Sequence, residues 1–344
     1  MNCKTLIPLL LLLTSAQVRG AEPSEETWRN ITQQVGGERW GYAGVTYVTA
    51  APDGSSLLAG VSAAGLWRST DTGGTWKRLG AAGPEAGSIG HRTYSIRFDP
   101  RDAKRFWVSG NYGPGLFETR DDGQTFRRLG NLQHLDLVAI DFTDPERKTF
   151  LAGQHEQARS LMRSKDGGVT WDCLGLALPE QTNFSTDPLV LDGQTYLINC
   201  AGWKRGLAWG LYRTADGGSS WTKVASEGPF GPALVHPDGT LYWAITWTYG
   251  MLKSTDRGLT WKKLPGPVTS PPQALPDGTL GSLGDERLYI SKDGAQSWQP
   301  LGPKLPYKKM TGWTYLSASK TFVVWRMSGK RVEDAIFAWT ADAP

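Results

Sequence analysis

Short apolar segments separated by turn sequences run along most of the chain, and this pattern predicts β-strands rather than helices. The region 137–174 shows the pattern in full. Its expected elements are an inner strand at 137–142, a turn at 144–147, a second strand at 149–153, a third strand at 161–164 and an outer strand at 170–174. Similar turns recur at 52–54, 99–101, 236–239 and 276–278. The pattern therefore favours an all-β fold made of units of four short strands.

One eight-residue motif recurs six times. It begins with Ser or Thr, has Asp at the third position and a small residue at the fifth, and ends with Ser or Thr followed by an aromatic residue, as in Ser69–Trp76. The six copies begin at residues 69, 119, 164, 214, 254 and 291. This spacing suits four short strands per repeat, and a repeat of this length predicts blades arranged around an axis.

The residue types of the motif are those of a tight turn rather than of a catalytic centre. An Asp in such a turn accepts hydrogen bonds from backbone amides that follow it, and Gly adopts the unusual backbone angles. The final aromatic ring is expected to pack between neighbouring sheets. We therefore assign a structural role to the six aspartates, which are Asp71, Asp121, Asp166, Asp216, Asp256 and Asp293.

The motif is identified as the Asp-box, or BNR repeat, and from about residue 27 onward the chain resembles the sialidase-like Asp-box β-propellers. It is also similar to the single propellers of xyloglucanases, sortilin and photosystem II assembly factors. The resemblance implies that the Asp-box turns lie on the outer rim and that ligands bind on the opposite face. We call this opposite face, made of the connections between blades and the loops between second and third strands, the loop face.

The two ends of the chain together predict one more blade. Residues 336–342 align with the third strand of a repeat and residues 27–31 with the fourth strand. We therefore expect a single domain over residues 21–344 that is a seven-bladed β-propeller of four-stranded antiparallel blades, with six blades as the alternative. The last blade is closed by the N- and C-terminal strands.

The first twenty residues predict export. Lys4 precedes an apolar run at residues 6–13, and small residues follow it, which is typical of a secretory signal peptide over residues 1–20. We expect a secreted or periplasmic protein with no membrane span. Charged residues make up only 20% of the chain and the formal net charge is +4, so we expect no nucleic-acid partner. We also expect a monomer.

Two cysteines remain after this segment. In an oxidising compartment Cys173 and Cys200 could form one disulfide, and the alternative is two buried thiols.

Aromatic and charged residues are interleaved in the segments expected on the loop face, a combination that suits sugar rings. We expect about half of the tryptophans to pack between blades instead. The candidate substrate-binding residues are Arg39, Trp40, His91, Arg92, Trp203, Arg205, Trp247, Tyr249 and Lys309.

Histidines and carboxylates alternate in the same region. His134, Asp136, His155 and Glu156 are candidate catalytic residues, because His titrates near neutrality and a carboxylate can fix its tautomer. A divalent metal at His91, His134 and His155 is the alternative. No other cofactor is expected. Ordinary hydrogen-bonded loop histidines would give the same pattern.

Two classes of function follow. The first is a propeller that binds a glycan, either without cleaving it or cleaving it as a glycosidase or polysaccharide lyase. The sialidase Arg-Ile-Pro signature is missing, since Arg29-Asn30-Ile31 has no proline, and xyloglucanases place one acid on each of two facing propellers. The second class is a non-enzymatic scaffold that holds a protein segment. Fold alone does not decide between them.

Overall fold

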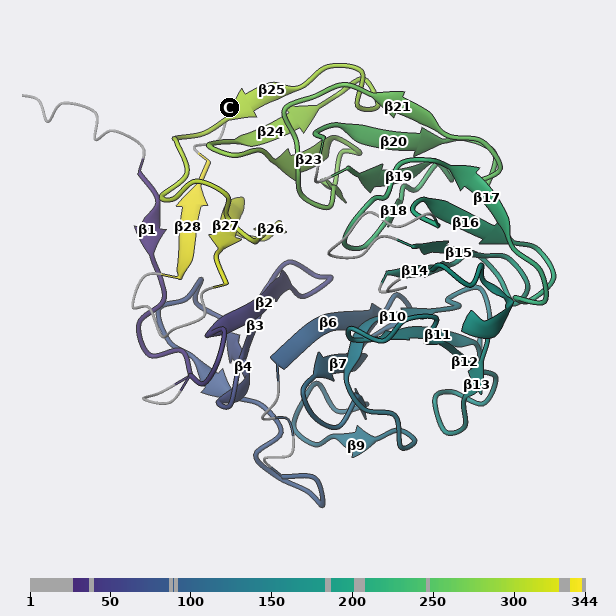
Figure 1. Cartoon of the computed structure of the whole chain (residues 1–344). Coiled ribbons are helices and arrows are strands. Elements are labelled where there is room, and N and C mark those ends of the chain that lie inside the picture. The colour runs from purple at the N-terminus through teal and green to yellow at the C-terminus, as the bar shows by residue number, and fades with distance from the viewer. Residues whose placement is uncertain are drawn as a thin grey trace, which may run out of the picture.

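The computed structural model describes residues 27–36, 40–86, 89, 92–182, 187–200, 208–245, 248–327 and 335–341. These residues form seven four-stranded antiparallel sheets arranged in a ring, together with a single turn of 3₁₀ helix at Gly175–Ala177 (Figure 1). The prediction of a seven-bladed all-β propeller is confirmed, and the six-bladed alternative is wrong.

The blades are numbered here in chain order. Blade 1 consists of β2 (Val45–Ala50), β3 (Leu57–Val61), β4 (Gly65–Ser69) and β5 (Lys77–Arg78). Blade 2 consists of β6 (Arg92–Asp99), β7 (Asp102–Asn111), β8 (Leu116–Thr119) and β9 (Arg127–Arg128). Blade 3 consists of β10 (Leu135–Ile140), β11 (Phe150–Gln154), β12 (Leu161–Ser164) and β13 (Asp172–Cys173). Blade 4 consists of β14 (Pro188–Val190), β15 (Tyr196–Asn199), β16 (Leu211–Thr214) and β17 (Thr222–Ala225).

Three blades complete the ring. Blade 5 consists of β18 (Leu234–Val235), β19 (Leu241–Ala244), β20 (Met251–Ser254) and β21 (Lys262–Leu264). Blade 6 consists of β22 (Gln273–Ala274), β23 (Leu280–Leu283), β24 (Leu288–Ser291) and β25 (Gln299–Leu301). Blade 7 consists of β26 (Gly312–Leu316), β27 (Thr321–Trp325), β28 (Ile336–Thr340) and the N-terminal strand β1 (Arg29–Asn30).

The two ends of the chain meet in blade 7. Strand β1 pairs with β28, with Arg29 opposite Ala338 and Asn30 opposite Phe337, and Figure 1 shows the two strands side by side. Because β28 is the third strand of this blade and β1 its fourth, the predicted closure is confirmed. Closure of the ring joins the first blade to the last.

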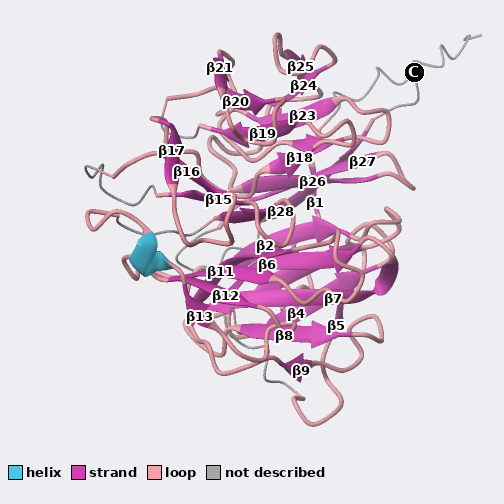
Figure 2. Ribbon diagram, turned by 90° about the vertical axis from the view of Figure 1, so that its right-hand side faces the viewer, coloured by secondary structure: helices cyan, strands magenta, loops and turns pink. Residues whose placement is uncertain are grey.

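The hydrophobic core is divided among the seven junctions between neighbouring blades. Each junction has its own cluster of buried side chains, and Leu58 of blade 1, for example, packs with Phe106 of blade 2. The second strand of a blade is therefore covered on both faces by the neighbouring blades, which is why all five residues of β3, the second strand of blade 1, are buried. The outermost strands are short (Figure 2). Two of them, Lys77–Arg78 and Arg127–Arg128, are entirely charged, and such edges resist pairing with other chains.

The repeated turns link the third and fourth strands of blades 1 to 6. In the first turn, Asp71 accepts hydrogen bonds from the backbone amide of Thr75 at 2.8 Å and from the hydroxyl of Ser69 at 2.8 Å. The amide of Gly73 donates to the hydroxyl of Ser69 at 2.7 Å, and Gly73 has a φ of 84°, in the left-handed region. Trp76 at the end of the motif packs in the core between blades 7 and 1.

The predicted strand bounds in blade 3 were close but not correct at every end. The inner strand begins at Leu135 and ends at Ile140, because Asp141 turns the chain by accepting a hydrogen bond from the amide of Thr143 at 2.9 Å. The outer strand keeps only Asp172 and Cys173. The third strand, Leu161–Ser164, lies where it was predicted.

Of the two alternatives for Cys173 and Cys200, the disulfide is not formed. Both thiols are free, and Cys173 lies exposed on the outer strand of blade 3 whereas Cys200 is buried in blade 4. Burial raises the pKa of the Cys200 thiol to about 12. The alternative of two buried thiols therefore holds for Cys200 alone.

The predicted signal peptide at residues 1–20 lies outside the described residues. Within the described ranges, no helix has the length and apolar character needed to cross a bilayer.

Candidate functional site

Four residues predicted to be catalytic lie close together at the loop-face end of blade 3. His134 immediately precedes β10, Asp136 lies within it, and His155 and Glu156 directly follow β11. The pairing of β10 with β11 shifts register between Leu135 and Val138, so Asp136 lies in a bulge. Bulges of this kind redirect side chains next to functional sites.

The central contact of this cluster is a hydrogen bond between His155 and Asp136. The Nδ1 atom of His155 lies 2.7 Å from Oδ1 of Asp136, whose side chain is 1% exposed. The Nε2 atom of the same ring lies 3.2 Å from the hydroxyl of Tyr112 and 3.8 Å from Oε1 of Glu156. Asp136 therefore fixes the orientation of the imidazole so that Nε2 faces Tyr112 and Glu156.

Asn111 completes the support of this pair and was not identified from the sequence. Its side chain is fully buried, and Nδ2 donates to Oδ1 of Asp136 at 3.1 Å and lies 3.4 Å from Nδ1 of His155. Asn111 ends β7, and an Asn beside Gly in a loop sequence ordinarily indicates a turn. The sequence feature that could have identified Asn111 as a site residue was its position at the loop-face end of the second strand of blade 2.

His134 holds neighbouring loops together through both its side chain and its backbone. Its Nδ1 atom accepts a hydrogen bond from the amide of Tyr112 at 3.1 Å, and its carbonyl oxygen accepts one from the amide of His155 at 2.6 Å. These contacts join three loops. The geometry gives His134 a positioning role in the cluster.

The guanidinium of Arg92 lies between two tyrosine rings from neighbouring blades. Its Cζ atom lies 5.5 Å from the ring centroid of Tyr42 and 5.4 Å from that of Tyr112. Nη2 also contacts Sδ of Met327 at 3.3 Å. The tyrosines are 66% and 51% exposed, and among the described residues no carboxylate forms an ion pair with Arg92. The result is a cation held on aromatic faces and open to a ligand.

The backbone is strained in the loops of this cluster. Tyr112, His134 and Glu156 have φ values of 62°, 55° and 56°, which place three non-glycine residues in the left-handed region. Such residues are uncommon and recur at ligand-binding sites, where the surrounding contacts hold them.

Behind the cluster, the inner strand of blade 2 contributes Tyr94. Burial and the negative charges of Asp187 and Asp136 raise the pKa of the Tyr94 phenol well above its usual value. The phenol therefore stays neutral, and the two buried carboxylates lie within electrostatic reach of it.

The predicted substrate-binding residues are divided by the structure. Trp40 is buried, donates from Nε1 to the carbonyl of Val35 at 2.9 Å and packs in the core between blades 7 and 1, so its assignment to the binding face is wrong. Tyr249 donates to Asp285 at 2.9 Å, which raises the pKa of the Tyr249 phenol, and the amide of Lys309 donates to the carbonyl of Asp285. These two lie on the loops of blades 5 to 7. The remaining predicted residues lie outside the described ranges: Arg39, His91, Trp203, Arg205 and Trp247.

The metal site predicted at His91, His134 and His155 stays a prediction. In the described ranges, no three His, Cys, Asp or Glu side chains are grouped so as to hold a metal ion. His91, one of the three predicted ligands, lies outside those ranges.

The chain is similar to two groups of proteins. The family model of the photosynthesis system II assembly factor YCF48 matches residues 131–264, which include blades 3 to 5. A xyloglucanase of a Paenibacillus species is 25% identical over 74% of this chain and 30% of its own length. The photosystem II assembly lipoprotein Ycf48 of Synechococcus sp. (strain CC9902) is 29% identical over 47% of this chain and 46% of its own length.

A solved structure described as YCF48 bound to D1 peptide superposes with a TM-score of 0.59 at 15% identity, covering 96% of this chain and all of that chain. At this identity the likeness concerns the fold. The chain spans less than half the length of the two curated relatives. Together these matches support a propeller of the BNR-repeat type.

Proposed function

We propose that the protein is a non-enzymatic, exported propeller that holds a protein segment on its loop face. The observation that carries this proposal is the Arg92 guanidinium, held between the exposed rings of Tyr42 and Tyr112 without a carboxylate partner in the described structure. Tyr and Arg are the residue types that contribute most to binding energy in protein interfaces.

The burial of Asp136 argues against glycoside hydrolysis by this cluster. Hydrolysis requires two carboxyl groups that reach the substrate, but the Asp136 side chain is 1% exposed and its Oδ1 atom is engaged by Asn111 and His155. Glu156, which is about half exposed, is then left as the single carboxylate of the predicted four-residue set that a ligand can reach.

Two of the similar proteins support a protein partner. One is named as an assembly lipoprotein, and one solved structure of the same fold holds a peptide. We assign the repeated turns to the Asp-box of the sialidase-like superfamily as part of the same proposal. In this assignment the six turns build the ring and the loop face binds the partner.

A second candidate function is glycan binding by the same face. It is favoured by the match to a xyloglucanase over 74% of this chain and by the exposed rings of Tyr42 and Tyr112, since sugar rings stack on aromatic faces.

Titration of defined ligands tests the proposal. The purified chain is screened against an array of synthetic peptides and, in parallel, against neutral and acidic oligosaccharides, and each ligand that binds is titrated by fluorescence anisotropy. We expect peptide binding that weakens about tenfold or more in Arg92→Ala, as for a central interface arginine. Arg127→Ala is the matched control, because Arg127 lies on the outer strand of the same blade and Glu118 keeps two other arginine partners.

Three outcomes would contradict the proposal. Equal affinity in the two variants would remove Arg92 from the site. Oligosaccharide binding without peptide binding would select the second candidate. Release of new reducing ends or unsaturated uronates by the wild-type chain, lost in His155→Ala, would show that the cluster is catalytic.

A further inference from the structure

Arg97 places a positive charge on the inner wall of the ring. It lies on β6, the innermost strand of blade 2, and Figure 1 shows β6 beside β2, the innermost strand of blade 1. Nε of Arg97 donates to the carbonyl oxygen of Val138, on the innermost strand of blade 3, at 3.1 Å. The guanidinium therefore lies over the inner strand of the next blade.

This contact between neighbouring inner strands does not require a charge. Arg97 is the third residue before the proline of the turn that follows its strand, and the equivalent residue of blade 6 is Gln273. The Gln273 amide donates from Nε2 to the carbonyl oxygen of Trp313 on the inner strand of blade 7. A neutral side chain thus makes the same contact, and blades 1 and 5 carry the uncharged Thr49 and Leu234 at this position. The positive charge in blade 2 needs another explanation.

The rest of the Arg97 guanidinium has no partner in the described part of the chain. A guanidinium has five N–H donors, but neither Nη1 nor Nη2 forms a hydrogen bond or an ion pair with another described residue. Burial lowers the pKa of Arg97, and Tyr47 and the charge of Asp187 raise it in part. A desolvated charge without a counterion is costly in a folded protein.

Asp187 is the carboxylate within electrostatic reach of Arg97, but its hydrogen bonds join blades 4 and 5. Its Oδ2 atom accepts from Nδ2 of Asn199 at 3.1 Å and from the amide of Gly231 at 2.9 Å. Asn199 ends the second strand of blade 4, and Gly231 precedes the inner strand of blade 5. No ion pair links Asp187 to the Arg97 guanidinium, so the counterion position beside Arg97 is not taken by this carboxylate.

Tyr47 offers a second donor beside Arg97. It lies half-buried on β2 and packs against the hydrophobic cluster between blades 1 and 2. Burial raises the pKa of the Tyr47 phenol, and the nearby charge of Arg97 lowers it in part, so the phenol keeps its proton at neutral pH. Its hydroxyl makes no hydrogen bond with a described residue. Arg97 and Tyr47 therefore both present unused donors at the centre of the ring.

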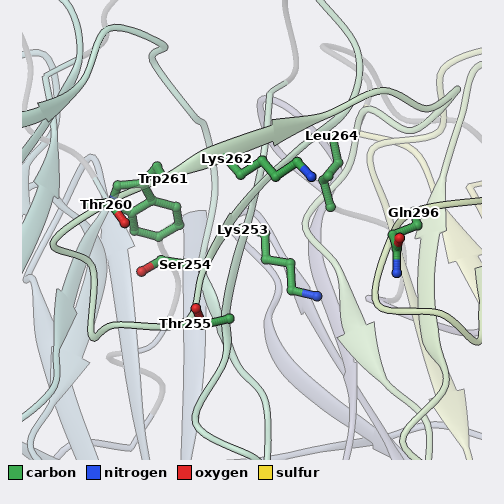
Figure 3. Close-up of a pocket in the computed structure, with 8 residues that line it drawn as sticks. All are labelled: Lys253, Ser254, Thr255, Thr260, Trp261, Lys262, Leu264 and Gln296. Carbon is green, nitrogen blue, oxygen red and sulfur yellow. The ribbon is translucent and has the colours of Figure 1, made fainter.

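Two lysines on the outer edge of blade 5 provide a contrast. Figure 3 shows Lys253 and Lys262 beside a surface depression of about 390 Å³. Lys262 is exposed, and Nζ of Lys253 donates to the carbonyl oxygen of Gly294 at 3.3 Å. A lysine ammonium at the surface is strongly hydrated and needs no counterion. These two lysines therefore do not indicate a bound anion, whereas the desolvated Arg97 does.

We propose that Arg97 and Tyr47 bind the carboxylate group of a small organic acid at the centre of the ring. A guanidinium donates two parallel N–H bonds to a carboxylate, and the Tyr47 hydroxyl donates to the same group. A single negative charge fits better than the double charge of phosphate, because Asp187 lies within electrostatic reach. The site lies five residues along β6 from Arg92 and is independent of the proposed protein-binding role.

Nuclear magnetic resonance of the chain labelled with ¹⁵N-arginine tests the proposal. The Nε–H group of Arg97 should exchange slowly because it is hydrogen-bonded to Val138, and its resonance is assigned by its absence from Arg97→Lys. Sodium acetate should shift this resonance with saturation, sodium phosphate should bind more weakly, and neutral acetamide should have no effect. Tyr47→Phe should weaken acetate binding about fivefold, the effect of one lost hydrogen bond. Arg101→Gln, at an exposed arginine of the following turn, is the matched control and should change the affinity less than twofold.

Urea unfolding of Arg97→Met separates anion binding from a structural role. In acetate-free buffer this variant should be at least as stable as wild type, because a desolvated charge has been removed. Acetate should stabilise wild type and Arg101→Gln by mass action but not Arg97→Met. Equal stabilisation of Arg97→Met, the absence of a saturable acetate shift in wild type, or an equal loss of affinity in Tyr47→Phe and Arg101→Gln would each overturn the proposal. If Arg97→Met does not fold, the comparison of Tyr47→Phe with Arg101→Gln still decides.

Discussion

Arg29 donates a hydrogen bond from Nη2 to the carbonyl oxygen of Thr72 at 3.1 Å, and so joins the N-terminal strand of blade 7 to the first repeated turn. Thr72 is the fourth residue of that turn. In blades 4 to 6 the fourth residue also accepts a hydrogen bond from a cation of the preceding blade, and these contacts are Arg163 to Gly217, Arg213 to Arg257 and Lys253 to Gly294. The junction between the two ends of the chain therefore uses the same acceptor position as these continuous junctions, although Arg29 lies on a fourth strand and the other three cations lie on third strands.

Replacement of Arg29 by Ala should weaken ring closure. The contact is exposed, so we expect the free energy of unfolding to fall by only about 0.5–1 kcal/mol. Urea unfolding followed by tryptophan fluorescence measures the change. Arg29→Lys should recover part of the loss, since an ammonium can still donate to Thr72. A variant as stable as wild type would show that the contact is dispensable.

Acid should destabilise the ring through its turn aspartates. Hydrogen bonds from the residue at the seventh position of each turn hold the pKa of Asp71, Asp166, Asp256 and Asp293 at about 2. Because these folded-state values lie below the usual value of 3.8, the carboxylates stabilise the fold above pH 4, and this contribution is lost as the pH falls toward 2.

Chemical denaturation at a series of pH values tests this dependence. The decline between pH 4 and pH 2 should be smaller in Asp256→Asn than in wild type, because the amide does not titrate. Glu227→Gln, a change at a half-buried position outside the turns, should leave the decline unaltered. A wild-type stability that is constant down to pH 2 would contradict the prediction.

The two cysteines should differ sharply in reactivity. Cys173 is exposed, whereas Cys200 is buried and its thiol has a pKa raised to about 12, so the folded chain should offer little thiolate at Cys200. In a chain beginning after residue 20, a thiol reagent should label one site in buffer and two in denaturant. Cys173→Ser should abolish labelling of the folded chain, and fast labelling of that variant would disprove the assignment.

Asn111 should influence ligand binding without touching the ligand. Asn111→Ala removes a buried donor from Asp136, and we expect a loss of about 1–3 kcal/mol in the free energy of unfolding. Binding of loop-face peptides should weaken as well, because His155 and Tyr112 depend on this support. Asn111→Asp offers a carboxylate in place of the donor and should not rescue either property. Unchanged peptide binding in a stable Asn111→Ala chain would show that Asn111 does not support the binding site.

The fold was predictable because every copy of the turn motif carries the residue types that form the turn. Each copy encodes its aspartate, its small residue and its packing aromatic locally, and the match of residues 27–31 and 336–342 to two parts of one repeat revealed the closure. Strand ends were less predictable. The bulge at Asp136 and the turn at Asp141 depend on the partner strand and on side-chain hydrogen bonds that a pattern of apolar residues does not encode.

The sequence predicted which loops contribute to the site but not the contacts within it. Sequence placed His134, Asp136, His155 and Glu156 in adjoining loops, and the structure brings them together. It did not reveal that Asp136 is buried or that the His134 ring is engaged by a backbone amide. The arrangement around Arg92 combines rings from two blades, and such contacts between distant segments have no local signature.

The pairing of β1 with β28 also has a consequence for protein engineering. In blades 1 to 6 a covalent turn joins the third and fourth strands, whereas in blade 7 these strands come from opposite ends of the chain. A peptide linker joining the ends would create the missing turn, and the chain could then be opened at any of the six existing turns. Each circular permutant should rebuild the same ring, because every junction relies on local packing and not on the position of the termini.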